Sequence, residues 1–284
     1  MSLPRFVLLL SCAVLFATPL RSNAQQAPSP REYHVLMVGN SLTYTNNLPA
    51  LLRAVGASQG TTITTETYAA PNGMLSERLH DGHAAEALRT RKFDVVVLQE
   101  IGGKLAACMA TPDARKAPCA ASVHAYTELA ALAKASGART LVFTTWAPDD
   151  RWQGSLNRSA RMIAVKTSAK VFNAAGVLDA LRKADPKANL LPDGIHPSTR
   201  GSLIIALALY REITDTAPVA KDLLITAPFL PQNAAVSADT AMESQPGLAG
   251  DGKATVIPAS LVEPLIQALP APGSTEMDPP GRGR

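Results

Sequence analysis

Two patterns of apolar residues alternate along residues 33–215. Short apolar or β-branched runs bounded by polar residues are typical of strands buried in a parallel sheet. Longer segments repeat apolar residues every three or four positions, as one face of a helix does. The predicted strands are Tyr33–Val38, Thr61–Ala69, Phe93–Leu98, Thr140–Thr144 and Lys170–Asn173. The predicted helices are Leu48–Ala57, Leu75–Leu88, Ser122–Ser136, Leu156–Ser168, Val177–Ala184 and Leu203–Ile213.

The regular alternation of strand and helix predicts an α/β fold. We expect a three-layer α/β/α sandwich with a flavodoxin-like, five-stranded parallel sheet over residues 33–216. Residues 217–284 are rich in Pro and Ala and read as a C-terminal extension that is partly disordered. One apolar run there, Ala254–Leu269, could pack as a helix, whereas Pro270 to Arg284 reads as a disordered tail.

The first 24 residues resemble a signal peptide. Arg5 precedes an apolar stretch, Phe6–Ala17, that is too short to span a bilayer comfortably, and small residues end at Ala24. We therefore expect export to the periplasm or the extracellular space, cleavage near Ala24 and no stable membrane insertion afterwards. An uncleaved anchor is the alternative. Residues 25–32 read as a flexible lead-in.

The distribution of charged residues and histidines bears on possible nucleic-acid partners and metal sites. The net charge is +4, but Lys and Arg are scattered, so we expect no nucleic-acid partner. His80 and His83 have a spacing that could hold a metal on a helix, but no third ligand accompanies them and a solvated face is favoured. We expect neither a metal nor an organic cofactor.

Two cysteines, Cys108 and Cys119, remain after residue 24. In an exported chain such a pair favours a disulfide around a small loop. Two free thiols on a mobile loop are the alternative.

Polar residues that could take part in catalysis lie where the predicted strands end. Ser41 follows the first strand, Gly73 the second and Gln99 the third, while Asp193 and His196 lie on the loop before the last helix. The carboxyl ends of parallel strands share one edge of the sheet, where ligands bind. These residues should therefore converge although they are far apart in sequence.

This set of side chains suits acyl transfer. A serine hydroxyl needs a base within hydrogen-bond reach, and His196 is the candidate base for Ser41. Asp193 can hold the other ring nitrogen of His196. The candidate oxyanion donors are the backbone N–H groups of Ser41 and Gly73 and the side-chain amide of Gln99.

The chain resembles the SGNH hydrolases, also called the GDSL esterase/lipase superfamily. Gly39-Asn40-Ser41-Leu42-Thr43 is similar to the family's first block, Gly73 to its second and Asp193-Gly194-Ile195-His196-Pro197-Ser198 to its last. The third block departs from the usual Gly-x-Asn-Asp, because Leu98-Gln99-Glu100 stands at the strand end. The resemblance, together with export, implies a serine esterase acting on small acyl esters, with O-acetyl groups on carbohydrate as the expected substrate.

Other roles stay open for these residues. Ser41 could be only a helix N-cap, His196 a surface histidine and Gln99 a plain loop amide. The candidate substrate-lining residues are Asn40, Asn72, Glu100 and Trp146. Asn72 could instead be a turn residue, Glu100 an ion-pairing carboxylate and Trp146 a cap on the core. An O-acyltransferase with the same triad and a non-catalytic binding protein are the alternative functions.

Overall fold

The computed structural model describes residues 31–271, apart from 103–104, 106–107, 109–116 and 251. Its centre is a five-stranded parallel sheet with the strand order β2-β1-β3-β4-β5, as predicted. The strands are β1 Glu32–Asn40, β2 Thr62–Ala70, β3 Val95–Gln99, β4 Arg139–Thr144 and β5 Lys170–Asn173. Val38 of β1 pairs with Tyr68 of β2 and Leu98 of β3. This register brings the carboxyl ends of β1, β2 and β3 to one edge of the sheet.

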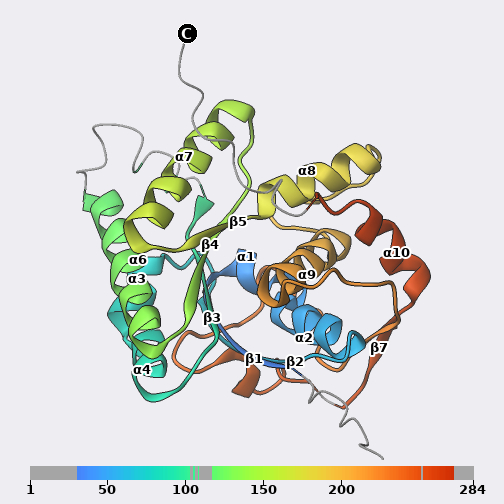
Figure 1. Ribbon diagram of the computed structural model, residues 1–284, viewed down its shortest axis with the longest axis horizontal. Helices are drawn as coiled ribbons and strands as arrows, with labels where there is room; N and C mark the ends of the chain where they lie inside the picture. Colours follow the sequence, from blue (N-terminus) through green and yellow to red (C-terminus); the bar gives the residue numbers. More distant parts are fainter. Residues whose placement is uncertain (1–30, 103–104, 106–107, 109–116, 251, 272–284) are drawn as a thin grey trace, which may run out of the picture.

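Helices cover both faces of the sheet (Figure 1). One face carries α2 Leu48–Ser58, α8 Ala174–Ala184 and α9 Thr199–Thr214. The other carries α3 Leu75–Asp81, α4 His83–Thr90, α6 Ala117–Ser136 and α7 Asp150–Thr167. Successive residues of β3 alternate between these two cores: Val95 and Val97 belong to the first, and Val96 and Leu98 to the second. Burial on both faces explains why this strand is a continuous apolar run.

Two of the differences between predicted and observed helices have a local cause. The helix expected over 75–88 is broken at Gly82, whose φ of +81° ends α3 and precedes α4. The helix expected from Leu156 begins at Asp150, because the carboxylate of Asp149 accepts a hydrogen bond from Trp152 N at 2.8 Å. Its first turn is polar, so hydrophobic spacing did not reveal it.

Residues 217–271, which we call the C-terminal segment, pack against the face that carries α2 and α9. They contain β6 Leu223–Ile225, η3 Met242–Ser244, β7 Thr255–Ile257 and α10 Ala259–Gln267. The buried side chains of Leu223, Ile225, Val262 and Leu265 join that core. The helix α10 lies within the apolar run singled out in the sequence, whereas residues 272–284 of the predicted tail lie outside the described residues.

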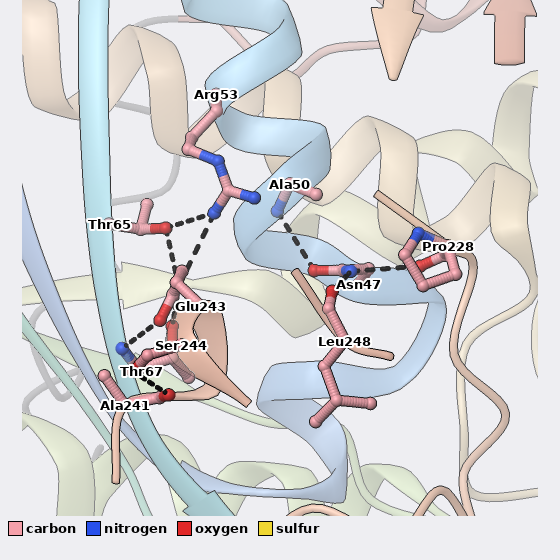
Figure 2. Close-up of polar contacts among 10 residues, drawn as sticks. All are labelled: Asn47, Ala50, Arg53, Thr65, Thr67, Pro228, Ala241, Glu243, Ser244 and Leu248. Atoms are coloured by element: carbon pink, nitrogen blue, oxygen red, sulfur yellow. Dashed lines mark hydrogen bonds and ion pairs between the residues drawn. The ribbon is translucent and has the colours of Figure 1, made fainter. Parts of the chain in front are cut away.

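Glu243 fastens the C-terminal segment to the edge strand β2 (Figure 2). Its carboxylate accepts hydrogen bonds from Thr67 N at 2.8 Å and from the hydroxyls of Thr65 and Thr67 at 2.7 Å. The guanidinium of Arg53 on α2 lies 3.5 Å from the same carboxylate. An edge strand exposes unpaired backbone groups, and this contact occupies one of them.

The predicted disulfide joins Cys108 to Cys119, with the Cα atoms 4.9 Å apart. Both cysteines are buried in the core on the face of the sheet that α6 covers, and Cys119 lies in the first turn of α6. Residues 109–116 of the small loop between them lie outside the described residues. Among the helices that the structure describes, none combines the length and the apolar character needed to cross a membrane.

Candidate active site

Ser41 is the first residue of α1, Ser41–Tyr44, and follows β1 without a break. Asn40 is the N-cap of this helix, because its side-chain oxygen accepts a hydrogen bond from Leu42 N at 3.1 Å. Capping is therefore the role of Asn40, and the alternative in which Ser41 serves only as the cap is wrong. The strand and the helix together hold Ser41 at the carboxyl edge of the sheet, where it is 6% exposed.

Asp193 shapes the loop that carries His196. Its Oδ1 accepts hydrogen bonds from Ile195 N at 2.9 Å and His196 N at 2.7 Å, while its Oδ2 lies 2.7 Å from His196 Nδ1. Gly194 makes the turn with a φ of +80°. The hydrogen bond from the His196 backbone, supported by the His196 ring, lowers the pKa of Asp193 to about 2. Asp193 is therefore a carboxylate at neutral pH.

The ring of His196 connects this loop to Ser41. His196 Nε2 lies 2.9 Å from Ser41 Oγ, across 155 positions of sequence. Because Nδ1 faces a carboxylate, it carries the proton, and Nε2 is left to accept the serine hydroxyl proton. The structure thus brings Ser41, His196 and Asp193 into one hydrogen-bonded row, the arrangement that activates a serine nucleophile.

Gly73 lies beside this row, tied to Asn40. Asn40 Nδ2 donates to the Gly73 carbonyl at 3.0 Å, which joins the turn after β2 to the turn after β1. The N–H of Gly73, a predicted oxyanion donor, donates to the Ala70 carbonyl at 3.1 Å. Asn40, predicted as a substrate-lining residue, is only 2% exposed and connects the two turns.

The carboxamide of Gln99 does not have the predicted orientation. Its Oε1 accepts hydrogen bonds from Asn40 N at 3.0 Å and Thr43 Oγ1 at 2.8 Å. Its Nε2 donates to the Glu100 carbonyl at 2.6 Å. The side chain is 1% exposed, so it supports the Ser41 turn from the protein interior. This geometry differs from the expected one, in which the amide donates to an oxyanion.

The remaining predicted lining residues occupy three different environments. Glu100 is 1% exposed, so its carboxylate is part of the interior and does not line a substrate surface. Trp146 donates its indole N–H to the Ile195 carbonyl at 2.7 Å and so braces the histidine loop. Asn72 is exposed and has a φ of 55°, as expected of a turn residue.

Comparisons with known proteins agree with this architecture. No protein-family model and no curated protein sequence matches the chain. Among solved structures, a protein from Slackia heliotrinireducens, provisionally described as an SGNH hydrolase, matches with a TM-score of 0.50 and 23% identity. That match covers 64% of this chain and 98% of the other. Axe2, an acetylxylan esterase from Geobacillus stearothermophilus, matches with a TM-score of 0.50 and 16% identity, over 66% of this chain and 96% of the other.

The chain has the SGNH-hydrolase fold. At these identities the likeness establishes the fold, and the chemistry rests on the residues described above. The matched part leaves about a third of this chain outside the comparison, so the SGNH fold is extended here by further segments.

One residue near the site of this SGNH fold was missed in the sequence. Asn46 has a φ of 56°, and its Nδ2 donates to the Pro197 carbonyl at 2.7 Å and to Ser202 Oγ at 3.0 Å. Its backbone N–H donates to the Leu230 carbonyl of the C-terminal segment at 2.8 Å. Asn46 therefore joins the Ser41 segment to the histidine loop. The signal was the Asn46-Asn47 pair, since Asn tolerates the left-handed region better than most residues.

The C-terminal segment also contacts the residues on either side of Asn46. The hydroxyl of Tyr44 donates to the Gln232 carbonyl at 2.7 Å. Figure 2 shows the second contact, in which Asn47 Nδ2 donates to the Pro228 carbonyl at 3.0 Å. These bonds fix the backbone that follows Ser41. No group of three or more metal-binding side chains occurs within the part of the chain that the structure describes.

Proposed function

We propose that the chain is an exported serine esterase that hydrolyses small acyl esters, with O-acetyl groups on carbohydrate as its substrates. The observation that carries the proposal is the Ser41–His196–Asp193 row, with 2.9 Å between hydroxyl and imidazole and 2.7 Å between imidazole and carboxylate. A serine with this pair of partners has a base in reach and an acid that orients the base. The row lies at the carboxyl edge of the sheet, where open α/β sheets bind ligands, and this position supports the proposal.

The reaction proceeds in two halves. Ser41 Oγ attacks the acyl carbonyl carbon while His196 Nε2 takes the hydroxyl proton. The tetrahedral intermediate collapses, the C–O bond to the alcohol breaks, and His196 returns the proton to the leaving alcohol. Water then attacks the acyl-serine with His196 again as base, which releases the carboxylic acid and restores Ser41. Asp193 stays ionised throughout and stabilises the imidazolium.

Because the Gln99 amide donates to the Glu100 carbonyl, the donors to the oxyanion are backbone N–H groups. Ser41 is the first residue of α1, so its N–H has no acceptor within that helix and is the first candidate donor. The N–H of Gly73 can contribute if it divides its hydrogen bond between the Ala70 carbonyl and the oxyanion, as bifurcated bonds do.

The substrate class rests on two supports. The first is the likeness in fold to Axe2, an acetylxylan esterase from Geobacillus stearothermophilus. The Cys108–Cys119 disulfide fits a protein that works in an oxidising compartment, as an esterase acting on extracellular polysaccharide would.

Turnover of p-nitrophenyl acetate by wild type and Ser41→Ala tests the proposal. Removal of the nucleophile should lower kcat/KM by about 10³-fold or more while the melting temperature stays close to that of wild type. Acetylated xylo-oligosaccharides, assayed in parallel by acetate release, test the substrate class. Equal turnover by the two proteins would overturn the esterase assignment.

A further inference from the structure

Gln99 and Glu100 are adjacent at the end of β3, and both are 1% exposed. Side chains of successive residues along a strand point to opposite faces of the sheet. Gln99 accordingly reaches the Ser41 turn, whereas Glu100 reaches α3 and α6 on the other face. Two neighbouring buried polar side chains thus contact two different turns of the site.

Gln99 acts on the Ser41 turn as an acceptor. Asn40 N can only donate and the Glu100 carbonyl can only accept, so these two partners fix the orientation of the carboxamide. Thr43 Oγ1 donates to the same oxygen. A Cβ at Gly39 would lie 2.5 Å from that oxygen, so the contact requires glycine at this position.

Glu100 acts on the Gly73 turn in a corresponding way. Its carboxylate accepts hydrogen bonds from Leu75 N at 3.2 Å, Ile101 N at 2.8 Å and Ser122 Oγ at 2.7 Å. Leu75 is two residues beyond Gly73 and begins α3. Glu100 therefore fixes the position at which the chain leaves the Gly73 turn.

The two turns are also bonded to each other through Asn40 Nδ2 and the Gly73 carbonyl. The contacts close a ring that runs from Gln99 to Asn40, to Gly73, along the chain to Leu75, to Glu100, and back through the peptide bond to Gln99. A closed ring of buried hydrogen bonds resists displacement of either turn, because each unpaired buried group would be costly.

We propose that Gln99 and Glu100 form a latch that positions the Ser41 and Gly73 turns relative to each other, in the place where other SGNH hydrolases have an asparagine block. Both are positioning residues that act through Asn40, Thr43 and Leu75. The inference rests on the proposed esterase function, because the quantity that the latch controls is the rate of acyl transfer from Ser41. It assigns to Gln99 the role of acceptor and removes it from the oxyanion donors.

A double-mutant cycle between Gln99 and Thr43 tests the first half of the latch. Thr43→Val removes the hydroxyl with little change of shape and should lower kcat for p-nitrophenyl acetate about 3- to 10-fold with KM unchanged. Gln99→Leu should lower kcat further, by about 100-fold, and Thr43→Val should add little in that background because both substitutions break one contact. If Gln99 donated directly to the oxyanion, Thr43→Val would leave kcat unchanged and the two effects would multiply. That result would overturn the proposal.

Three substitutions at and around Glu100 test the second half. Glu100→Met leaves Leu75 N without its acceptor and should lower kcat by about 10-fold or more. Glu100→Gln keeps an oxygen for Leu75 and Ile101 and can donate to Ser122, so it should restore kcat to within a few-fold of wild type. The control Ser122→Ala removes only the bond from α6 to Glu100 Oε2, while Oε1 still accepts from Leu75 N and Ile101 N, so it should change the melting temperature while kcat is retained. A merely structural Glu100 would lower the melting temperature of Glu100→Met and leave kcat of the folded protein unchanged, which would overturn the latch.

The same assays separate the latch from the proposed function. If Ser41→Ala loses turnover while Glu100→Met and Gln99→Leu keep wild-type kcat, the esterase stands and the latch fails. If Ser41→Ala retains turnover, the esterase assignment itself fails. Should Glu100→Met not fold, the Gln99–Thr43 cycle decides, because Thr43→Val is the mildest of these changes.

Discussion

The two halves of the candidate active site are built in different ways. The Ser41 half is buried and continues directly from the inner strand β1, and it donates hydrogen bonds to Gln99, to the Gly73 carbonyl and to the C-terminal segment. The His196 half lies on an exposed loop, where the side chains of Asp193 and His196 are 38% and 17% exposed. The core fixes the nucleophile, whereas a few hydrogen bonds fix the base.

This difference predicts a division between stability and activity. Substitutions of the buried residues that hydrogen-bond to the Ser41 turn leave polar groups unpaired. They should lower both the free energy of unfolding and the rate of turnover. Substitutions on the histidine loop change groups that water can reach, so they should lower the rate proportionally more than the free energy of unfolding. Substitutions at three positions test this division: Asp193 on the histidine loop, Asn46 where the two halves meet, and Trp146, which bonds to the histidine loop.

The largest effect is expected from Asp193→Asn. The asparagine oxygen can still accept from Ile195 N and His196 N, so the turn is kept, but its NH₂ group cannot accept from His196 Nδ1. We expect kcat to fall by about 10²-fold or more, since the wrong imidazole tautomer then faces Ser41. Steady-state kinetics with p-nitrophenyl acetate measure this. A loss below about threefold would show that Asp193 does not orient the base.

The pH dependence of stability gives the same residue a second test. The pKa of Asp193 is lowered to about 2, below its ordinary value of 3.8, so its contribution to stability is present above about pH 4 and is lost as the pH falls toward 2. The difference in unfolding free energy between wild type and Asp193→Asn should be constant from pH 8 to pH 5 and narrow between pH 4 and pH 2. Urea unfolding across this range measures it, and narrowing already between pH 7 and pH 5 would contradict the assigned cause.

A smaller effect is expected where the two halves meet, at Asn46. Asn46→Gly removes the links to Pro197 and Ser202 and tolerates the φ of 56°, so it should lower kcat about 10-fold. Asn46→Ala loses the same hydrogen bonds and adds backbone strain. Its free energy of unfolding should therefore be about 1–2 kcal/mol lower than that of Asn46→Gly. Kinetics and denaturant unfolding of the pair separate the two contributions. Equal stability of the two variants would contradict the left-handed conformation of Asn46.

The smallest effect is expected from Trp146→Phe. The smaller phenyl ring keeps an aromatic side chain, but the hydrogen bond to the Ile195 carbonyl, a contact worth about 1 kcal/mol, is lost. We expect kcat to fall two- to fivefold. The melting temperature should change little, because the Ile195 carbonyl can accept a hydrogen bond from water instead. A tenfold rise in KM with kcat unchanged would instead place Trp146 on the substrate-binding surface, as the sequence suggested.

The sequence predicted the sheet and the convergence of Ser41 and His196, because buried strands and their polar ends are local signals. Lys170–Asn173 was predicted with the bounds that β5 has. The break at Gly82 was missed because an apolar period contains no information about a positive φ. The packing of Leu223 and Ile225 was missed because a three-residue strand has too few positions to show a pattern, and its burial depends on the distant helix α2.

The orientation of Gln99 illustrates what local sequence does not contain. Its place at the end of β3 was predicted, but the direction of its amide depends on Gly39 and Asn40 of another strand. The same holds for Asn46, whose partners are 151 and 156 positions away. The types of residues at the site were therefore visible in the sequence, whereas the hydrogen bonds that orient them depend on tertiary structure.

Covalent labelling of Ser41 by a fluorophosphonate tests the central claim most directly. Peptide mass spectrometry of the labelled wild-type protein should find the adduct on the peptide that contains Ser41, and His196→Ala should label at least 100-fold more slowly because the base is absent. Ser41→Ala should remain unlabelled. An adduct on another serine, or equal labelling rates for wild type and His196→Ala, would contradict the account of Ser41 as a nucleophile activated by His196.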